Sequence, residues 1–100
     1  MNITANPYID TNLFELAHYI DGYTMADVLK VFPDARMEGY EDEEKGYDGI
    51  EAGFSTWGGN FYLYSRWGRV RLGCLDGERN SHAEVWLNAI KSALASHKGN

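Results

Sequence analysis

The chain has 100 residues, of which 44% are hydrophobic and 14% aromatic, and its 9 basic and 15 acidic residues give a formal net charge of −6. A chain this rich in apolar residues can bury enough surface to offset its conformational entropy, which excludes an intrinsically disordered protein. This length supports one hydrophobic core rather than two, so we expect a single domain over residues 1–100.

Neither a targeting segment nor a metal motif is visible in the sequence. Residues 1–7 lack the basic and apolar segments of a signal peptide, and no stretch approaches the roughly 20 apolar residues of a membrane-spanning helix. One cysteine, Cys74, and three scattered histidines offer neither an internal disulfide nor a zinc-binding spacing. We therefore expect a cytoplasmic protein, in the host-cell cytoplasm if its source is viral, without membrane contact, metal or cofactor.

Two short helices are predicted in the first third of the chain. Residues Asn12–Ile20 carry apolar side chains at helical offsets, and the segment closes at Gly22. A second helix is expected after Thr24, because Asp27 completes a capping box with it and Pro33 stops the apolar stripe that follows.

The middle of the chain has the two-residue period of β-strands. Apolar and polar residues alternate in the segments Ile50–Ser55, Phe61–Tyr64 and Val70–Cys74. Glycine-containing turns separate these segments, so they predict a three-stranded antiparallel meander. Met37–Glu41 is a candidate fourth strand, although Gly39 weakens the pattern.

The last element predicted is an amphipathic helix. Ser81 and Glu84 form a capping-box pattern, and the run that follows ends near Lys98. Apolar residues recur within it at offsets of three, four and seven, with Trp86 as the expected anchor into the core.

These elements predict an α+β fold, in which helices cover one face of an antiparallel sheet. We expect a three- to four-stranded meander packed by the C-terminal amphipathic helix and the two short N-terminal helices. The other sheet face is then expected to meet solvent. The residues expected to face the core are Ile50, Phe54, Phe61, Leu63, Val70, Leu72 and Cys74 of the sheet and Trp86, Leu87, Ile90 and Leu94 of the helix.

Charge is divided unevenly along the chain. Residues 1–60 hold twelve acidic and three basic residues, a net of −9, whereas residues 61–100 hold three acidic and six basic residues, a net of +3. A calcium loop starting at Glu41 fails, because Lys45 and Ala52 fall at its fifth and twelfth positions. A solvated loop is the plain interpretation of such a charge run. The functional alternative is an acidic patch, flanked by tyrosines, that docks on a basic surface. Its candidate partner-binding residues are Tyr40, Glu41, Asp42, Glu43, Glu44, Tyr47, Asp48 and Glu51.

A second candidate surface is the outward face of the meander. Aromatic rings interleaved with arginines can stack nucleic-acid bases and contact phosphates, but the same residues also pair across strands as ordinary sheet stabilisation. The negative net charge opposes nucleic-acid binding, so this stays the alternative. The alternative nucleic-acid-binding residues are Tyr62, Tyr64, Arg66, Trp67, Arg69 and Arg71.

Catalytic motifs are missing from the sequence. Cys74, Asp76 and His82 could form a cysteine nucleophile with its base, but Cys74 alternates onto the expected core face, where a thiol is inert. We predict that the protein is not an enzyme and has no catalytic residues.

The sequence leaves three functional hypotheses. The first is a small acidic inhibitor that docks its patch on a nucleic-acid-handling site of a partner protein, as viral anti-defence proteins of the anti-CRISPR or anti-restriction type and toxin-immunity proteins do. The second is a nucleic-acid-binding hairpin. The third is a self-associating structural subunit, a homodimer for example, that uses exposed Trp57, Trp67 and tyrosine residues.

Overall fold

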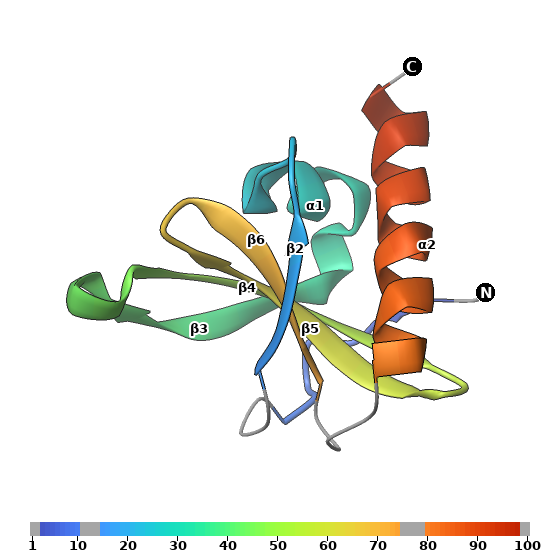
Figure 1. Ribbon diagram of the computed structural model, residues 1–100, viewed down its shortest axis with the longest axis horizontal. Helices are drawn as coiled ribbons and strands as arrows, with labels where there is room; N and C mark the ends of the chain where they lie inside the picture. Colours follow the sequence, from blue (N-terminus) through green and yellow to red (C-terminus); the bar gives the residue numbers. More distant parts are fainter. Residues whose placement is uncertain (1–2, 11–14, 75–79, 99–100) are drawn as a thin grey trace.

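The computed structural model describes residues 3–10, 15–74 and 80–98, and within them six strands form one antiparallel sheet (Figure 1). Two α-helices and two short 3-10 helices complete the described elements. The strands are β1 (Thr4–Ala5), β2 (Glu15–Ile20), β3 (Arg36–Asp42), β4 (Tyr47–Thr56), β5 (Gly59–Arg66) and β6 (Arg69–Cys74). The helices are α1 (Met25–Val31), η1 (Pro33–Ala35), η2 (Glu43–Lys45) and α2 (Asn80–Lys98).

The predicted meander is confirmed as β4–β5–β6, with Phe54 opposite Phe61 and Leu63 opposite Leu72. The sheet order is β1-β4-β5-β6-β2, and β3 also pairs with β4. The candidate fourth strand is therefore confirmed as β3, despite its glycine. The ten-residue β4 shares one edge between two partners: β3 pairs with Tyr47–Ala52, and β1 pairs with Phe54 and Ser55.

The predicted first helix is wrong, because residues Glu15–Ile20 form strand β2 at the sheet edge. Ile20 lies opposite Val70 and Tyr19 opposite Arg71, so the backbone hydrogen bonds of β6 are completed by a segment about fifty residues away in sequence. The spacing of Leu16, Ala17 and Ile20 fits a helix, and pairing with β6 overrides this local preference. The described chain thus has two α-helices rather than three, and the sheet has six strands rather than three or four.

The second predicted helix is confirmed as α1, together with its capping box. The Thr24 backbone N–H donates to Asp27 Oδ2 at 2.8 Å, and the Asp27 N–H donates to Thr24 Oγ1 at 3.2 Å. The C-terminal helix is confirmed as α2, which begins at Asn80; the side chain of Ser81 lies outside the described residues. No helix in the described ranges has the length and apolar character needed to span a lipid bilayer.

Both helices pack on one sheet face and form the main core with it (Figure 1). Trp86 is fully buried, and its ring stacks on Phe61, which stacks in turn on Phe54, with centroid separations of 5.0 Å in each case. Trp86 Nε1 donates to Thr56 Oγ1 at 3.2 Å, which satisfies the only polar atom of the buried indole. The predicted core residues are confirmed, except that Ile50 is only partly buried and the Cys74 side chain lies outside the described residues.

The second sheet face is covered around Tyr62 and Tyr64, which corrects the expectation that these two residues meet solvent, whereas Arg69 on the same face is exposed. Tyr62 and Tyr64 are only 6% and 3% exposed, and they form a smaller core with Ile9, Met37 and Tyr47. Two glycines make this possible. A Cβ atom built on Gly73 would lie 2.4 Å from the Tyr62 ring, and one built on Gly53 would lie 2.3 Å from the Asn6 carbonyl oxygen.

Substitution of Gly73 by alanine tests this close packing. Alanine would be favoured over glycine in a strand by about 0.5 to 1 kcal/mol, but the overlap with the Tyr62 ring is expected to cost about 1 to 3 kcal/mol. We expect a net loss of stability, measured as a lower midpoint of urea unfolding. Gly58→Ala is the matched control, because its Cβ would meet nothing closer than 3.7 Å. Equal midpoints for the two variants would contradict the packing.

Candidate protein-interaction surface

The acidic segment forms the end of the β3–β4 hairpin, which extends away from the body of the molecule (Figure 1). Asp42 caps the short helix η2, because its Oδ1 accepts hydrogen bonds from the N–H groups of Glu44 and Lys45 at 3.1 and 3.3 Å. Gly46 ends η2 in the left-handed conformation, with φ of 74°. The turn is therefore ordered by its own backbone and by one aspartate.

The carboxylates of this segment fall into three groups. Asp42 and Asp48 bind backbone N–H groups, Asp48 accepting from Ile50 N at 3.1 Å, so both have a local structural role. Glu51 is half-buried. The remaining three, Glu41, Glu43 and Glu44, are exposed, and we name them the acidic tip. Within the described residues, no hydrogen bond or ion pair engages any side chain of the acidic tip.

The acidic tip is electrostatically strained. Glu41 lies directly opposite Asp48 across β3 and β4, and like charges in that position are destabilising. The nearby Arg66 donates through its Nε to the Lys45 carbonyl oxygen, and Arg69 pairs with Asp21. The exposed glutamates of the acidic tip are accessible to a cationic partner.

The hairpin end is fixed to the neighbouring β5–β6 turn. The Trp67 N–H donates to the Gly46 carbonyl oxygen at 2.7 Å, and Arg66 Nε donates to the Lys45 carbonyl oxygen at 2.9 Å. The indole of Trp67 covers Gly46 so closely that a Cβ there would lie 2.2 Å from the ring. The acidic tip is thus held in one place relative to the sheet.

A row of tyrosines leads from the hairpin end into the second sheet face. Ring centroids are 5.1 Å apart for Tyr40 and Tyr47, 5.8 Å for Tyr47 and Tyr64, and 5.4 Å for Tyr64 and Tyr62. Tyr40 is 54% exposed, whereas Tyr47 is half-buried. Of the two tyrosines predicted to flank the acidic patch, Tyr40 therefore offers the larger contact area to a partner.

The residues predicted as the alternative nucleic-acid surface differ in exposure. Tyr62 and Tyr64 are buried, so their rings cannot stack bases. The arginines and Trp67 are accessible, and Tyr19, which the sequence interpretation had placed in a helix, lies among them. Arg69 Cζ lies 3.6 Å and Arg71 Cζ 5.1 Å from the centre of the Tyr19 ring. We name Tyr19, Arg66, Trp67, Arg69 and Arg71 the arginine strip.

The two tryptophans predicted to form a self-association face lie far apart. Trp57 and Trp67 are 83% and 66% exposed, but they occupy the turns at opposite ends of the eight-residue β5. That strand spans roughly 26 Å, so the two indoles do not belong to one patch.

Metal and catalytic sites find no support in the described ranges. No group of three or more His, Cys, Asp or Glu side chains there is arranged to hold a metal ion. His82 stacks on Trp86 with ring centroids 5.8 Å apart, while the Cys74 side chain and Asp76 lie outside the described residues.

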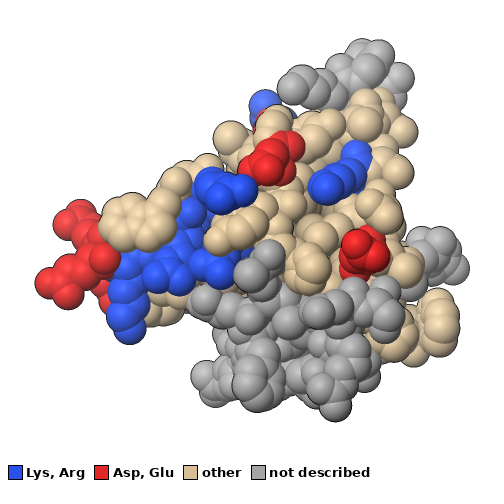
Figure 2. Space-filling model, in the orientation of Figure 1, with Lys and Arg blue, Asp and Glu red and all other residues tan. Residues whose placement is uncertain are grey.

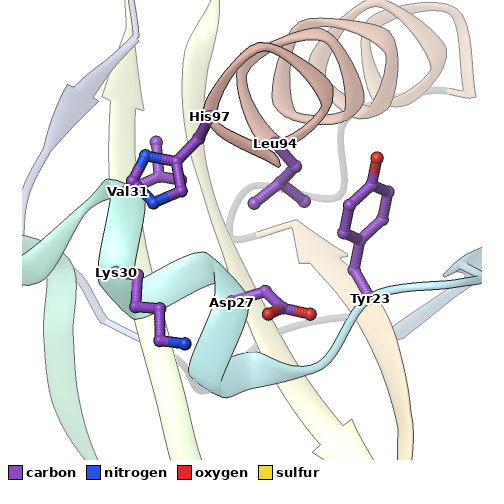
Figure 3. A pocket seen from close by; sticks show the side chains of 6 residues that line it. All are labelled: Tyr23, Asp27, Lys30, Val31, Leu94 and His97. Carbon is purple, nitrogen blue, oxygen red and sulfur yellow. The ribbon is translucent and has the colours of Figure 1, made fainter. Parts of the chain in front are cut away.

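A cleft of about 190 Å³ lies between α1 and the end of α2 (Figure 3). Its polar groups have structural roles: Asp27 belongs to the capping box, and Lys30 lies in the last turn of α1, where a cation interacts favourably with the helix dipole. Val31 and Leu94 line it with apolar surface. The complete lining is Tyr23, Asp27, Lys30, Val31, Leu94 and His97.

Comparison of the chain with protein-family models, with curated proteins and with solved structures found no match.

Glu51 gives the hairpin a pH-dependent stability. Its side chain lies against Gly39, between strands β3 and β5, and burial raises the pKa of this carboxyl above its usual value of 4.5. A carboxyl with a raised pKa in the folded state binds its proton more tightly there than in the unfolded chain. Folding stability therefore falls as pH rises from the usual value through the raised one, and the loss persists at neutral pH.

We expect Glu51→Gln to raise the thermal unfolding midpoint at pH 7, because the amide removes the cost of burying a charge. The gain should disappear below about pH 4, where the carboxyl is protonated in both states. Glu84→Gln, at an exposed position on α2, is the control and should change little at either pH. A gain for Glu51→Gln that is the same at pH 4 and pH 7 would contradict this account.

Proposed function

We propose that the protein is a small inhibitor that binds another protein, and that its acidic tip docks on a basic site that the partner uses to handle nucleic acid. The observation that supports this most directly is the set of three exposed glutamates at the end of a projecting hairpin, whose side chains form no ion pair or hydrogen bond within the described residues. A nuclease or another enzyme of nucleic-acid metabolism offers the complementary surface. A viral anti-defence protein and a toxin-immunity protein both fit this description.

Preorganisation supports the proposal. A partner that binds an ordered segment does not have to supply the free energy of ordering it. The η2 turn is capped by Asp42, closed by Gly46 and joined to the β5–β6 turn through Trp67. The glutamates are therefore carried on a backbone that is already fixed.

Charge repulsion within the hairpin also favours binding of a cationic partner. The facing pair of Glu41 and Asp48 costs stability in the free protein, and a cationic partner would relieve that cost on binding. Charges on the projecting hairpin also act over the Debye length, about 8 Å at physiological salt, and so accelerate encounter with a basic surface. Tyr40 adds exposed aromatic area beside the charges, which is typical of interface anchors.

Direct nucleic-acid binding is supported less well. Single-strand platforms need accessible rings on which bases stack, and the two tyrosines proposed for this role are buried. The acidic tip next to the arginine strip would also repel a phosphate backbone.

The proposal is tested by reversing two charges of the acidic tip. Glu43→Lys with Glu44→Lys should leave the fold intact, because both side chains are exposed and engage no described partner. The immobilised wild-type protein should capture a protein from its native host that heparin displaces, and the double variant should bind that protein with an association rate at least about tenfold slower. The rate should fall steeply with added salt for the wild type and weakly for the variant.

The matched control is Asp34→Lys with Glu84→Lys, which changes the net charge equally at two exposed positions outside the hairpin. Its association rate should stay close to that of the wild type. If both double variants slow association by the same factor, net charge rather than the acidic tip governs binding. If neither slows it, the acidic tip is not the docking site.

A further inference from the structure

The arginine strip gathers positive charge on the sheet surface formed by β2, β6 and the β5–β6 turn. Tyr19 and Arg71 are opposite each other across β2 and β6, and Arg66 and Arg69 are opposite each other across β5 and β6. The Tyr19 ring holds the guanidinium of Arg69 at 3.6 Å from its centre by a cation–π contact. Half of the Arg69 side chain is nevertheless exposed, so donors remain accessible for an anionic group.

The arginine strip and the acidic tip adjoin each other on one face of the molecule. Figure 2 shows Asp and Glu gathered at the end of the molecule where the hairpin projects, and Lys and Arg on the surface next to it. The hydrogen bonds from Trp67 to Gly46 and from Arg66 to Lys45 hold the two patches side by side. This face therefore has a negative end and a positive middle.

A face with adjacent patches of opposite charge is complementary to itself. Rotation of a second copy by 180° about an axis that lies in the plane of the face, perpendicular to the line joining the two patches, places the negative end of each copy on the positive patch of the other. Tyr40 and Trp67, 54% and 66% exposed, lie on the β3–β4 hairpin and the adjoining β5–β6 turn, and can supply the aromatic contact area of such an interface.

We propose that a second copy of this chain docks on the arginine strip with its acidic tip, and that the two copies form a two-fold symmetric dimer. The dimer covers both acidic tips. If the proposed function holds, dimerisation regulates the inhibitor by hiding its docking surface until a partner competes for it; the dimer itself does not depend on that function.

The dimer is tested by sedimentation of the purified protein over a range of concentrations. The wild type should reach twice its 11.3 kDa mass at low salt and should dissociate as salt is added. The tip variant, Glu43→Lys with Glu44→Lys, should dimerise at least about tenfold more weakly. The strip variant, Arg69→Glu with Arg71→Glu, should lose the dimer as well. If that variant does not fold, Arg69→Gln with Arg71→Gln removes the same two positive charges and should also weaken the dimer.

The net charge of the tip variant separates the loss of a specific contact from a change in overall repulsion. The tip variant changes the charge from −6 to −2, since two glutamates become lysines, and should associate more readily if net repulsion alone mattered. Asp34→Lys with Glu84→Lys carries the same −2 and should keep the dimer. Loss of association in the tip variant but not in this control would thus identify the contact.

Mixing the two variants provides the decisive measurement. In the two-fold arrangement both contacts of a mixed dimer are complementary: lysines of one tip face glutamates of one strip, and the wild-type tip faces the wild-type strip. The strip variant has a charge of −10, so the mixed pair totals −12, as does a wild-type pair. The mixture should recover a species of twice the monomer mass. A monomeric wild type, a dimer that survives in both variants, or an assembly larger than two chains would overturn the proposal.

Discussion

The contact between the Trp67 indole and Gly46 joins two hairpins that the chain builds separately. The β3–β4 hairpin carries the acidic tip and the β5–β6 turn carries part of the arginine strip; pairing of β4 with β5 places them side by side, and this contact fixes the end of one against the turn of the other. Glycine is required at position 46 for two reasons, since its φ is positive and since the indole occupies the space of a side chain. The position of the acidic tip against the β5–β6 turn therefore depends on the packing of one aromatic ring on one glycine.

The second constraint is the coverage of both sheet faces in a chain of 100 residues. Helices cover one face, where Trp86 stacks on sheet aromatics, whereas part of the other is covered by the sheet's own tyrosines and by Ile9, lying close to the backbone at glycine positions. This arrangement hides aromatic residues that would otherwise be accessible to ligands. Three of the exposed large aromatic side chains, Tyr40, Trp57 and Trp67, lie at or near hairpin ends.

Local patterns predicted most of the fold. Strict alternation identified β4, β5 and β6, and the capping residues Thr24 and Asp27 identified α1. Strand β2 was missed because its apolar residues follow helical spacing and its partner, β6, lies far away in sequence. The burial of Tyr62 and Tyr64 was missed because alternation assigns residues to a face but does not say whether that face is covered. Gly53 and Gly73 were the available signal, since a glycine within a strand often marks close approach of another group.

The β5–β6 turn has a further consequence. Trp67 and Gly68 both have positive φ, 52° and 75°, a geometry for which asparagine followed by glycine is the preferred pair. A bulky residue in that conformation costs on the order of 1 kcal/mol. Asparagine at this position would relieve that strain but would remove the ring that covers Gly46. The turn thus holds a residue in an unfavourable backbone conformation whose side chain packs on the neighbouring hairpin.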